Sequence, residues 1–241
     1  MKAIPWANPK TIEEARVIQE HLRSKVVTKG EIPEKQVHRI AGVDASITRD
    51  GMKMIGVICL LSWPGLELEE IVSAMDDVTF PYVPGYLSFR EIPVLLRASS
   101  QCQKSVDLAI VDGQGIAHPR RLGLASHLGL VTGWTTIGCA KSRLIGIADD
   151  PGPERGARSA LYHGNERIGT VVRTRVSVSP VWVSVGTGIG LADAEAWILR
   201  TARSYRLPEP VRCAHREAGK IRERLGGEEQ ADAPSKRSPR G

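Results

Sequence analysis

The stretch V-D-L-A-I-V-D-G-Q-G-I-A-H-P-R-R, residues 106–121, combines a short apolar run with an acid, two glycines and three basic side chains. The run 108–111 is too short for a helix and is bounded by turn residues, which predicts a buried strand. Asp112 follows the strand directly, and Gly113 and Gly115 permit a sharp turn and the close approach of a bulky group. Metal-dependent phosphate chemistry needs a carboxylate at a strand end with cations beside it. The basic residues of the stretch are His118, Arg120 and Arg121.

Upstream of this stretch, the pattern predicts one helix and three strands. T-I-E-E at 11–14 is a capping box, and apolar residues at helical spacing follow it. Alternation in I-A-G-V-D-A-S-I places Asp44 on the face opposite Val43. The turn Pro64-Gly65 separates the next two strands, so an antiparallel meander is expected. The predicted elements are a helix at 12–26 and strands at 40–47, 53–63 and 66–79.

Downstream, strands alternate with helices, which favours an α/β domain with a mixed sheet. No linker or internal repeat divides the chain, so residues 1–225 are expected to form a single domain. The glycine- and charge-rich segment 226–241 is expected to be a disordered tail. The predicted elements are a helix ending near 102, a helix at 122–131, a strand at 135–142, a surface loop at 148–160, a hairpin of 168–176 with 181–185, and helices at 191–203 and 211–225.

The composition indicates a basic protein without extracellular features. The 241 residues carry a formal net charge of +6, with a pI near 9.3, which fits either a polyanionic partner or a merely basic protein. The four cysteines form no C-x-x-C pair, which argues against a zinc site or a disulfide framework. No run approaches the ~20 apolar residues of a membrane span. We therefore expect a cytoplasmic protein that does not enter a membrane.

Asp44 and Asp112 are the first candidates for a metal site. Asp44 lies mid-strand among small apolar residues, where a carboxylate is either solvent-facing or paired with a metal. Asp112 is either an Asx-turn residue or a metal ligand. On neighbouring strands the two carboxylates would lie side by side, and one would stay protonated without a cation. Oxygen ligands with no Cys or His cluster favour Mg²⁺ or Mn²⁺ over zinc.

Glu91, His118 and His215 are further candidates with structural alternatives. Glu91 belongs to S-F-R-E at 88–91, a second capping-box pattern. Pro93 suits a first helical turn, so a helix that starts later would leave Glu91 free to face the acids. His118 and His215 are lone histidines, and most such residues are structural. Near a metal, His215 could ligate it, bind phosphate or shuttle a proton.

Two loops complete the candidates. P-Y-V-P at 81–84 is a rigid aromatic tip that suits entry into a base stack, or alternatively an ordinary connection with a surface tyrosine. G-T-G-I-G at 186–190 imitates a dinucleotide fingerprint, but Leu191 stands where the third glycine belongs. We therefore discount nucleotide binding at 186–190.

Together these segments resemble the endonuclease V (deoxyinosine 3′-endonuclease) family over most of residues 10–220. The two longest matching motifs are P-Y-V-P-G-Y-L-S-F-R-E at 81–91 and V-D-G-Q-G-I-A-H-P-R at 111–120. The others are I-A-G-V-D at 40–44, G-L-A-S-H-L-G at 123–129, G-C-A-K-S at 138–142 and L-P-E-P-V-R-C-A-H at 207–215.

The resemblance implies a ribonuclease H-like fold and divalent-metal cleavage of the second phosphodiester bond 3′ to a deaminated adenine. It matches Asp44, Asp112 and Glu91 to the metal-binding acids and His215 to a catalytic position near the metal. Tyr82 matches the wedge that separates strands at the lesion. Thr187 and Gly188 depart from the family, which usually has a basic or histidine pair there. The remaining implied nucleic-acid contacts are Pro81, Val83, Pro84, Gly113, Gly115, His118, Arg120 and Lys141.

The expected partner is DNA containing deoxyinosine, bound by a monomer with Mg²⁺ or, in its place, Mn²⁺. The alternative enzyme is another ribonuclease H-like metal nuclease, acting on inosine-containing RNA or on branched DNA. The alternative without catalysis is a basic nucleic-acid-binding module whose carboxylates are structural.

Overall fold

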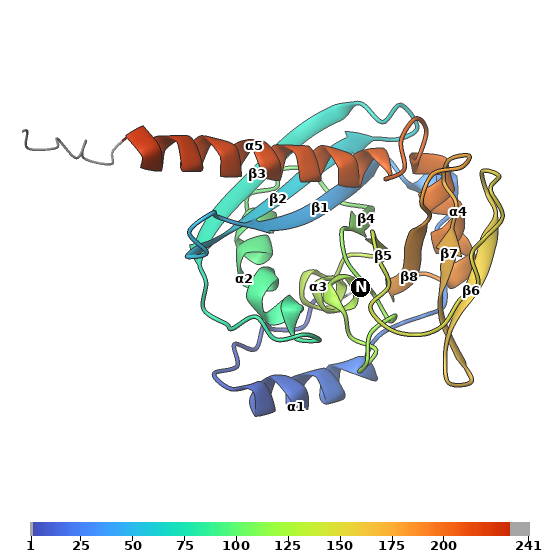
Figure 1. Cartoon of the computed structure of the whole chain (residues 1–241), viewed down its shortest axis with the longest axis horizontal. Helices are drawn as coiled ribbons and strands as arrows, with labels where there is room; N and C mark the ends of the chain where they lie inside the picture. Colours follow the sequence, from blue (N-terminus) through green and yellow to red (C-terminus); the bar gives the residue numbers. More distant parts are fainter. Residues whose placement is uncertain (1, 232–241) are drawn as a thin grey trace, which may run out of the picture.

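Within residues 2–231, which the computed structural model describes, eight strands form one mixed sheet (Figure 1). They are β1 (Arg39–Ile47), β2 (Lys53–Ser62), β3 (Leu68–Asp77), β4 (Leu108–Val111), β5 (Thr136–Ala140), β6 (Arg158–His163), β7 (Glu166–Val172) and β8 (Val181–Thr187). The strand order is β3-β2-β1-β4-β5-β8-β7-β6. Strands β1, β4 and β5 are parallel and the other neighbours antiparallel, which confirms the predicted meander and mixed sheet.

Five α-helices and one short 3₁₀ turn surround the sheet in the described residues. They are α1 (Ile12–Arg23), η1 (Glu34–Gln36), α2 (Leu87–Ser99), α3 (Leu124–Thr132), α4 (Leu191–Thr201) and α5 (Glu209–Ala231). Helices α2 and α3 cover one face of the sheet, and α4 and α5 cover the other. Helix α1 lies outside α2 and α3 (Figure 1).

Alternating side chains of the central strands pack into two parts of the core, one on each face of the sheet. Val43 of β1 packs with Leu95 of α2 and Leu128 of α3. Ile110 of β4 faces the other way, into the cluster that contains Trp197 of α4. Burial of these apolar side chains on both faces supplies the main driving force for the layered arrangement.

Helix α5 lies unusually close to strand β1, because Gly42 has no side chain. A Cβ atom at position 42 would collide with the carbonyl group of Pro210 in the first turn of α5. The small residue therefore lets the start of α5 pack directly on β1, and this places His215 beside Asp44. None of the helices described is long and apolar enough to cross a membrane.

Three sequence-based element predictions are wrong. The predicted surface loop 148–160 contains the start of β6, the strand at the edge of the sheet beside β7. Helix α2 begins at Leu87 with Tyr86 as N-cap, so neither the capping box at Ser88 nor a later start is correct. Helix α5 continues to Ala231, where a disordered tail was expected from residue 226. The rest of that tail, 232–241, lies outside the described residues.

Candidate active site

Two aspartates meet at the ends of adjacent parallel strands. The register pairs Val43 with Val111, and the Asp112 amide donates to the Val43 carbonyl over 2.9 Å. The next residue on each strand is therefore an aspartate, Asp44 on β1 and Asp112 just after β4. Asp44 is only 6% exposed, so the solvent-facing interpretation is wrong. Their proximity confirms the prediction that the two carboxylates lie side by side.

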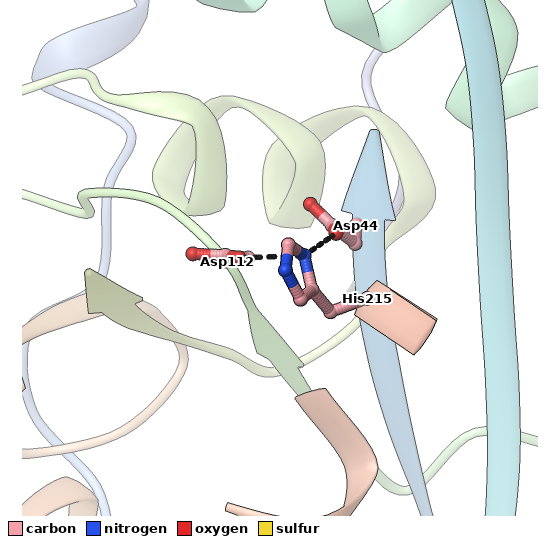
Figure 2. Close-up of side chains that lie close together, drawn as sticks. All are labelled: Asp44, Asp112 and His215. Carbon is pink, nitrogen blue, oxygen red and sulfur yellow. Dashed lines mark hydrogen bonds and ion pairs between the residues drawn. The ribbon is translucent and has the colours of Figure 1, made fainter. Parts of the chain in front are cut away.

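His215 reaches the same point from helix α5 (Figure 2). Its Nδ1 lies 2.8 Å from Asp44 Oδ2 and 3.9 Å from Asp112 Oδ2. A ring nitrogen that faces a carboxylate carries the proton, and Nε2 has no hydrogen bond within the described residues. Nε2 is thus the atom available to an incoming group.

Lys141, which follows β5, supplies a cation at the same cluster. Its Nζ donates to Asp112 Oδ2 at 2.5 Å and lies 3.3 Å from His215 Nδ1. The lysine side chain is about a third exposed, so its amine borders solvent as well as the carboxylate. It can neutralise Asp112 or contact a phosphate beside it.

The acids repel one another in this setting. Burial, followed by the negative charge of Asp112, raises the pKa of Asp44 to about 6, against the opposing effects of His215 and Lys141. Burial raises the pKa of Glu91 well above its usual range, and Asp44 and Asp112 add to that rise. A divalent cation placed among these groups would remove the repulsion.

The ligand atoms of three side chains fit a metal ion. One atom each from Asp44, Asp112 and His215 lie within 4.8 Å of one another. Two hard carboxylates and one imidazole suit a divalent metal ion. Glu91, in the second turn of α2, lines the same pocket but is not part of this three-residue cluster.

The cluster opens into a pocket of about 610 Å³. Tyr82, Leu87 and Arg90 line it together with residues of β1 and α5. Tyr82 is 68% exposed and stands in the expected rigid loop, with Pro81 and Pro84 also exposed and Val83 partly buried. The pocket therefore joins the acids to an exposed aromatic side chain.

The base of the loop that carries Tyr82 is held through one carbonyl. The oxygen of Gly85 accepts hydrogen bonds from Gln19 Nε2 (3.0 Å), His118 Nε2 (3.0 Å) and Arg120 Nη2 (2.6 Å). The Arg120 guanidinium also stacks on Tyr86, 4.1 Å from the ring centroid. These contacts fix the loop at its root while its tip remains exposed.

His118 and Arg120 thus have inward contacts that position the loop. Burial and the charge of Arg120 lower the pKa of His118 to about 4, so the ring is neutral. Gly115 is explained by packing, because a Cβ there would collide with the Val185 carbonyl of β8. At Gly113 the nearest atoms to an added Cβ belong to the Leu124 side chain, the closest at 3.2 Å. Nucleic-acid contacts by these four residues remain predictions.

Sequence reasoning missed two residues that support the site. Gln19 is fully buried on the apolar stripe of α1, and a polar residue on such a stripe was a usable signal. Arg206 donates from Nη2 to the carbonyls of Lys141 (2.6 Å) and Pro180 (2.8 Å), and no local pattern marks it.

The departures at the end of β8 have a structural role. Thr187 Oγ1 accepts from the Val27 amide at 3.0 Å, and the Gly188 amide donates to the Val27 carbonyl at 2.7 Å. They hold the segment that follows α1. Strand β8 is antiparallel to both neighbours, which agrees with discounting a dinucleotide site at 186–190.

Comparison with known proteins places the chain. The family model for Endonuclease V matches residues 20–216. The chain belongs to the endonuclease V family. An Endonuclease V from Dictyoglomus turgidum is 47% identical over 203 residues, which are 84% of this chain and 87% of the relative. This membership makes the chain an endonuclease, and the Asp44–Asp112–His215 cluster fits the metal ion on which such nucleases depend.

Solved structures agree with the fold. Endonuclease V from Streptomyces avermitilis has a TM-score of 0.87 and 38% identity, covering 93% of this chain and 98% of its own. Ciona intestinalis endonuclease V, solved with a 23mer DNA containing an inosine followed by a ribo-adenosine, has a TM-score of 0.78 and 26% identity. That alignment covers 89% of this chain and 98% of the Ciona chain. The ribonuclease H-like mixed sheet is thereby confirmed.

Proposed function

We propose that this protein cleaves DNA at deoxyinosine, hydrolysing the second phosphodiester bond 3′ to the lesion with Mg²⁺, for which Mn²⁺ can substitute. The observation that carries the proposal is the cluster of Asp44, Asp112 and His215 in one pocket with the exposed Tyr82. The inosine-containing DNA in the Ciona endonuclease V structure supports the choice of substrate.

Each side chain of the cluster has a role in the proposed reaction. Asp44 and Asp112 would hold the metal, with Glu91 of α2 as a further acid that lines the same pocket. A bound divalent ion activates water and offsets the charge that builds on the scissile phosphate. His215 keeps one proton on Nδ1, facing Asp44, and in the doubly protonated ring the second proton, on Nε2, would pass to the leaving oxygen. Lys141 orients Asp112 and attracts the phosphate backbone.

Selection of the lesion begins at the loop tip. Tyr82 enters the base stack, and its flanking prolines limit the entropy lost on ordering. A mispaired hypoxanthine is cheaper to open than a paired base, which favours the lesion over normal DNA. Pro81, Val83 and Pro84 shape the wedge, and the absence of a side chain at Gly113 lets the extruded base approach the backbone there.

The test separates binding from chemistry. Asp44→Ala and Asp112→Ala are expected to retain binding of an inosine-containing duplex but to lose nicking with Mg²⁺. The wild type is measured in parallel, and Asp77→Ala on the exposed end of β3 serves as the control for loss of an acid. Full nicking activity in either pocket variant would contradict the metal assignment.

A substrate panel decides between the related activities. Inosine-containing duplex DNA, inosine-containing RNA and branched DNA are compared with Mg²⁺ and with Mn²⁺. The proposal expects the inosine-containing DNA to be cleaved fastest. Faster cleavage of RNA or of branched DNA would assign the site to the alternative substrate. No nicking on any substrate with either metal would identify a binding module.

We also propose that the protein is cytoplasmic and acts as a monomer. All four cysteines are free thiols, which suits a reducing compartment. Light scattering coupled to size-exclusion chromatography measures the mass, and a dimer at micromolar concentration would contradict the monomer.

A further inference from the structure

Helix α5 presents two adjacent stripes with different roles. Cys213, Ala214 and Ala218 pack against β2, together with the partly buried Ile221 and Leu225. A second stripe, His215, Gly219 and Arg222, is spaced by four and three residues, so its members lie on one side of the helix. All three line the pocket that holds the acids. The first stripe explains how α5 is anchored, and the second is left facing the pocket.

Gly219 has no packing reason to be glycine. It lies in the interior of a 23-residue helix, where glycine is the least favourable residue after proline. A Cβ atom built at position 219 meets no described atom within 4 Å. This contrasts with Gly42, whose missing side chain admits Pro210. An open glycine on the pocket wall indicates that something outside the chain approaches the helix backbone there.

Arg222 differs from the basic residues Arg212, Arg216 and Lys220 that precede it on α5. Arg212 pairs with Glu209, and Arg216 and Lys220 both pair with Glu217. Arg222 is exposed on the pocket wall, and it forms no hydrogen bond or ion pair with the side chains described up to residue 225. Its charge is therefore available to a ligand that enters the pocket.

We propose that the stripe His215–Gly219–Arg222 is a track for the nucleic-acid backbone beyond the scissile phosphate. The strand crosses α5 over Gly219, and a neighbouring phosphate binds Arg222. This inference rests on the proposed function. Seven residues of helix span about 10 Å. A nucleic-acid strand carries one phosphate per ~3.4 Å of axis, so Arg222 lies within reach of a phosphate a few nucleotides from His215.

The first test removes the charge. Arg222→Gln is compared with Arg224→Gln, an exposed arginine on the same helix that does not line the pocket. Binding of an inosine-containing duplex is measured over a series of salt concentrations. Arg222→Gln is expected to weaken binding about three- to tenfold and to reduce the salt slope by about 0.9, the value for one lost phosphate contact. Arg224→Gln is expected to change binding less than twofold. Equal losses in the two variants would overturn the track.

The second test fills the open position. Gly219→Ala should raise the thermal midpoint, because alanine is the better helix former, yet weaken duplex binding. Gly219→Gln should weaken binding further, because its longer side chain covers the crossing point. Greater stability with unchanged binding and nicking in both variants would overturn the inference.

The activity of the wild-type protein distinguishes failure of the track from failure of the proposed function. If the wild type nicks inosine-containing DNA and the Arg222 and Gly219 variants bind and nick it equally well, only the proposed track is contradicted. A wild type that nicks no inosine-containing substrate with Mg²⁺ or Mn²⁺ would remove the proposed function and the track with it.

Discussion

Replacing Asp44 by Asn should make the metal-free protein more stable while abolishing its activity. Asp44 is buried beside Asp112, and burial together with that second charge raises its pKa to about 6. The folded protein thus holds a carboxylate that prefers to be neutral. Asparagine has nearly the same shape without the charge, so it removes the repulsion and still accepts a hydrogen bond from His215.

The raised pKa of Asp44 determines the size and sign of the stability change expected for Asp44→Asn. The rise from an ordinary aspartate pKa of 3.8 to about 6 corresponds to about 3 kcal/mol, at about 1.4 kcal/mol per tenfold change in proton affinity. Since folding raises this pKa, Asp44 contributes stability below about pH 4 that is lost as the pH rises through about 6. The stability gained by Asp44→Asn should therefore be near zero at about pH 4 and approach about 3 kcal/mol above about pH 7.

The assay is chemical unfolding in the presence of a chelator, across that pH range, for wild type and variant. Asp77→Asn is the control. Oδ1 of this exposed aspartate lies 3.7 Å from Lys53 Nζ, so its replacement should change the free energy of unfolding by less than about 0.5 kcal/mol. Added Mg²⁺ should stabilise the wild type but not Asp44→Asn. A variant less stable than the wild type at about pH 8 without metal would refute the reasoning.

Three other substitutions test separate parts of the site. Tyr82→Ala should weaken binding of an inosine-containing strand about tenfold, the order expected for one lost stacking contact; an equal loss on undamaged DNA in the same binding assay would remove the wedge role. Arg206→Gln should lower the nicking rate about tenfold with little change in KM, because the carbonyl of Lys141 loses the hydrogen bond from Arg206 that positions it. An unchanged nicking rate in steady-state kinetics would contradict this role. Gly115→Ala should lower the free energy of unfolding in denaturant by about 1–3 kcal/mol, because the added Cβ collides with the Val185 carbonyl. An unchanged free energy of unfolding would contradict the packing role of Gly115.

The central layers of the fold were predictable from local patterns. Apolar runs with turn residues marked β1 to β4, and the meander followed from the turn at Pro64-Gly65. Strand β6 was missed because half of its residues are exposed and only one is buried, so no apolar run marks it, and long-range pairing with β7 completes it. The end of α5 was misplaced because the composition after residue 225 indicates disorder, whereas the helix continues to Ala231.

The site was predictable where chemistry alone restricts the residue. Asp44 and Asp112 stood out as acids at strand positions, and the parallel register then joined them. The contribution of Arg206 depends on a loop meeting β5 and β8, which no local pattern encodes. The inward orientation of His118 and Arg120 also depends on distant partners, Gly85 and Gln19. The roles of these residues could not be predicted because they depend on contacts between residues far apart in the sequence.

The position of the nick on an end-labelled duplex with one deoxyinosine tests the central claim most directly. With Mg²⁺, we expect one nick, at the second phosphodiester bond 3′ to the inosine. The nick should disappear with a chelator and in Asp112→Ala. Cleavage at another bond, cleavage in the chelator, or equal cleavage of an undamaged duplex would contradict the account.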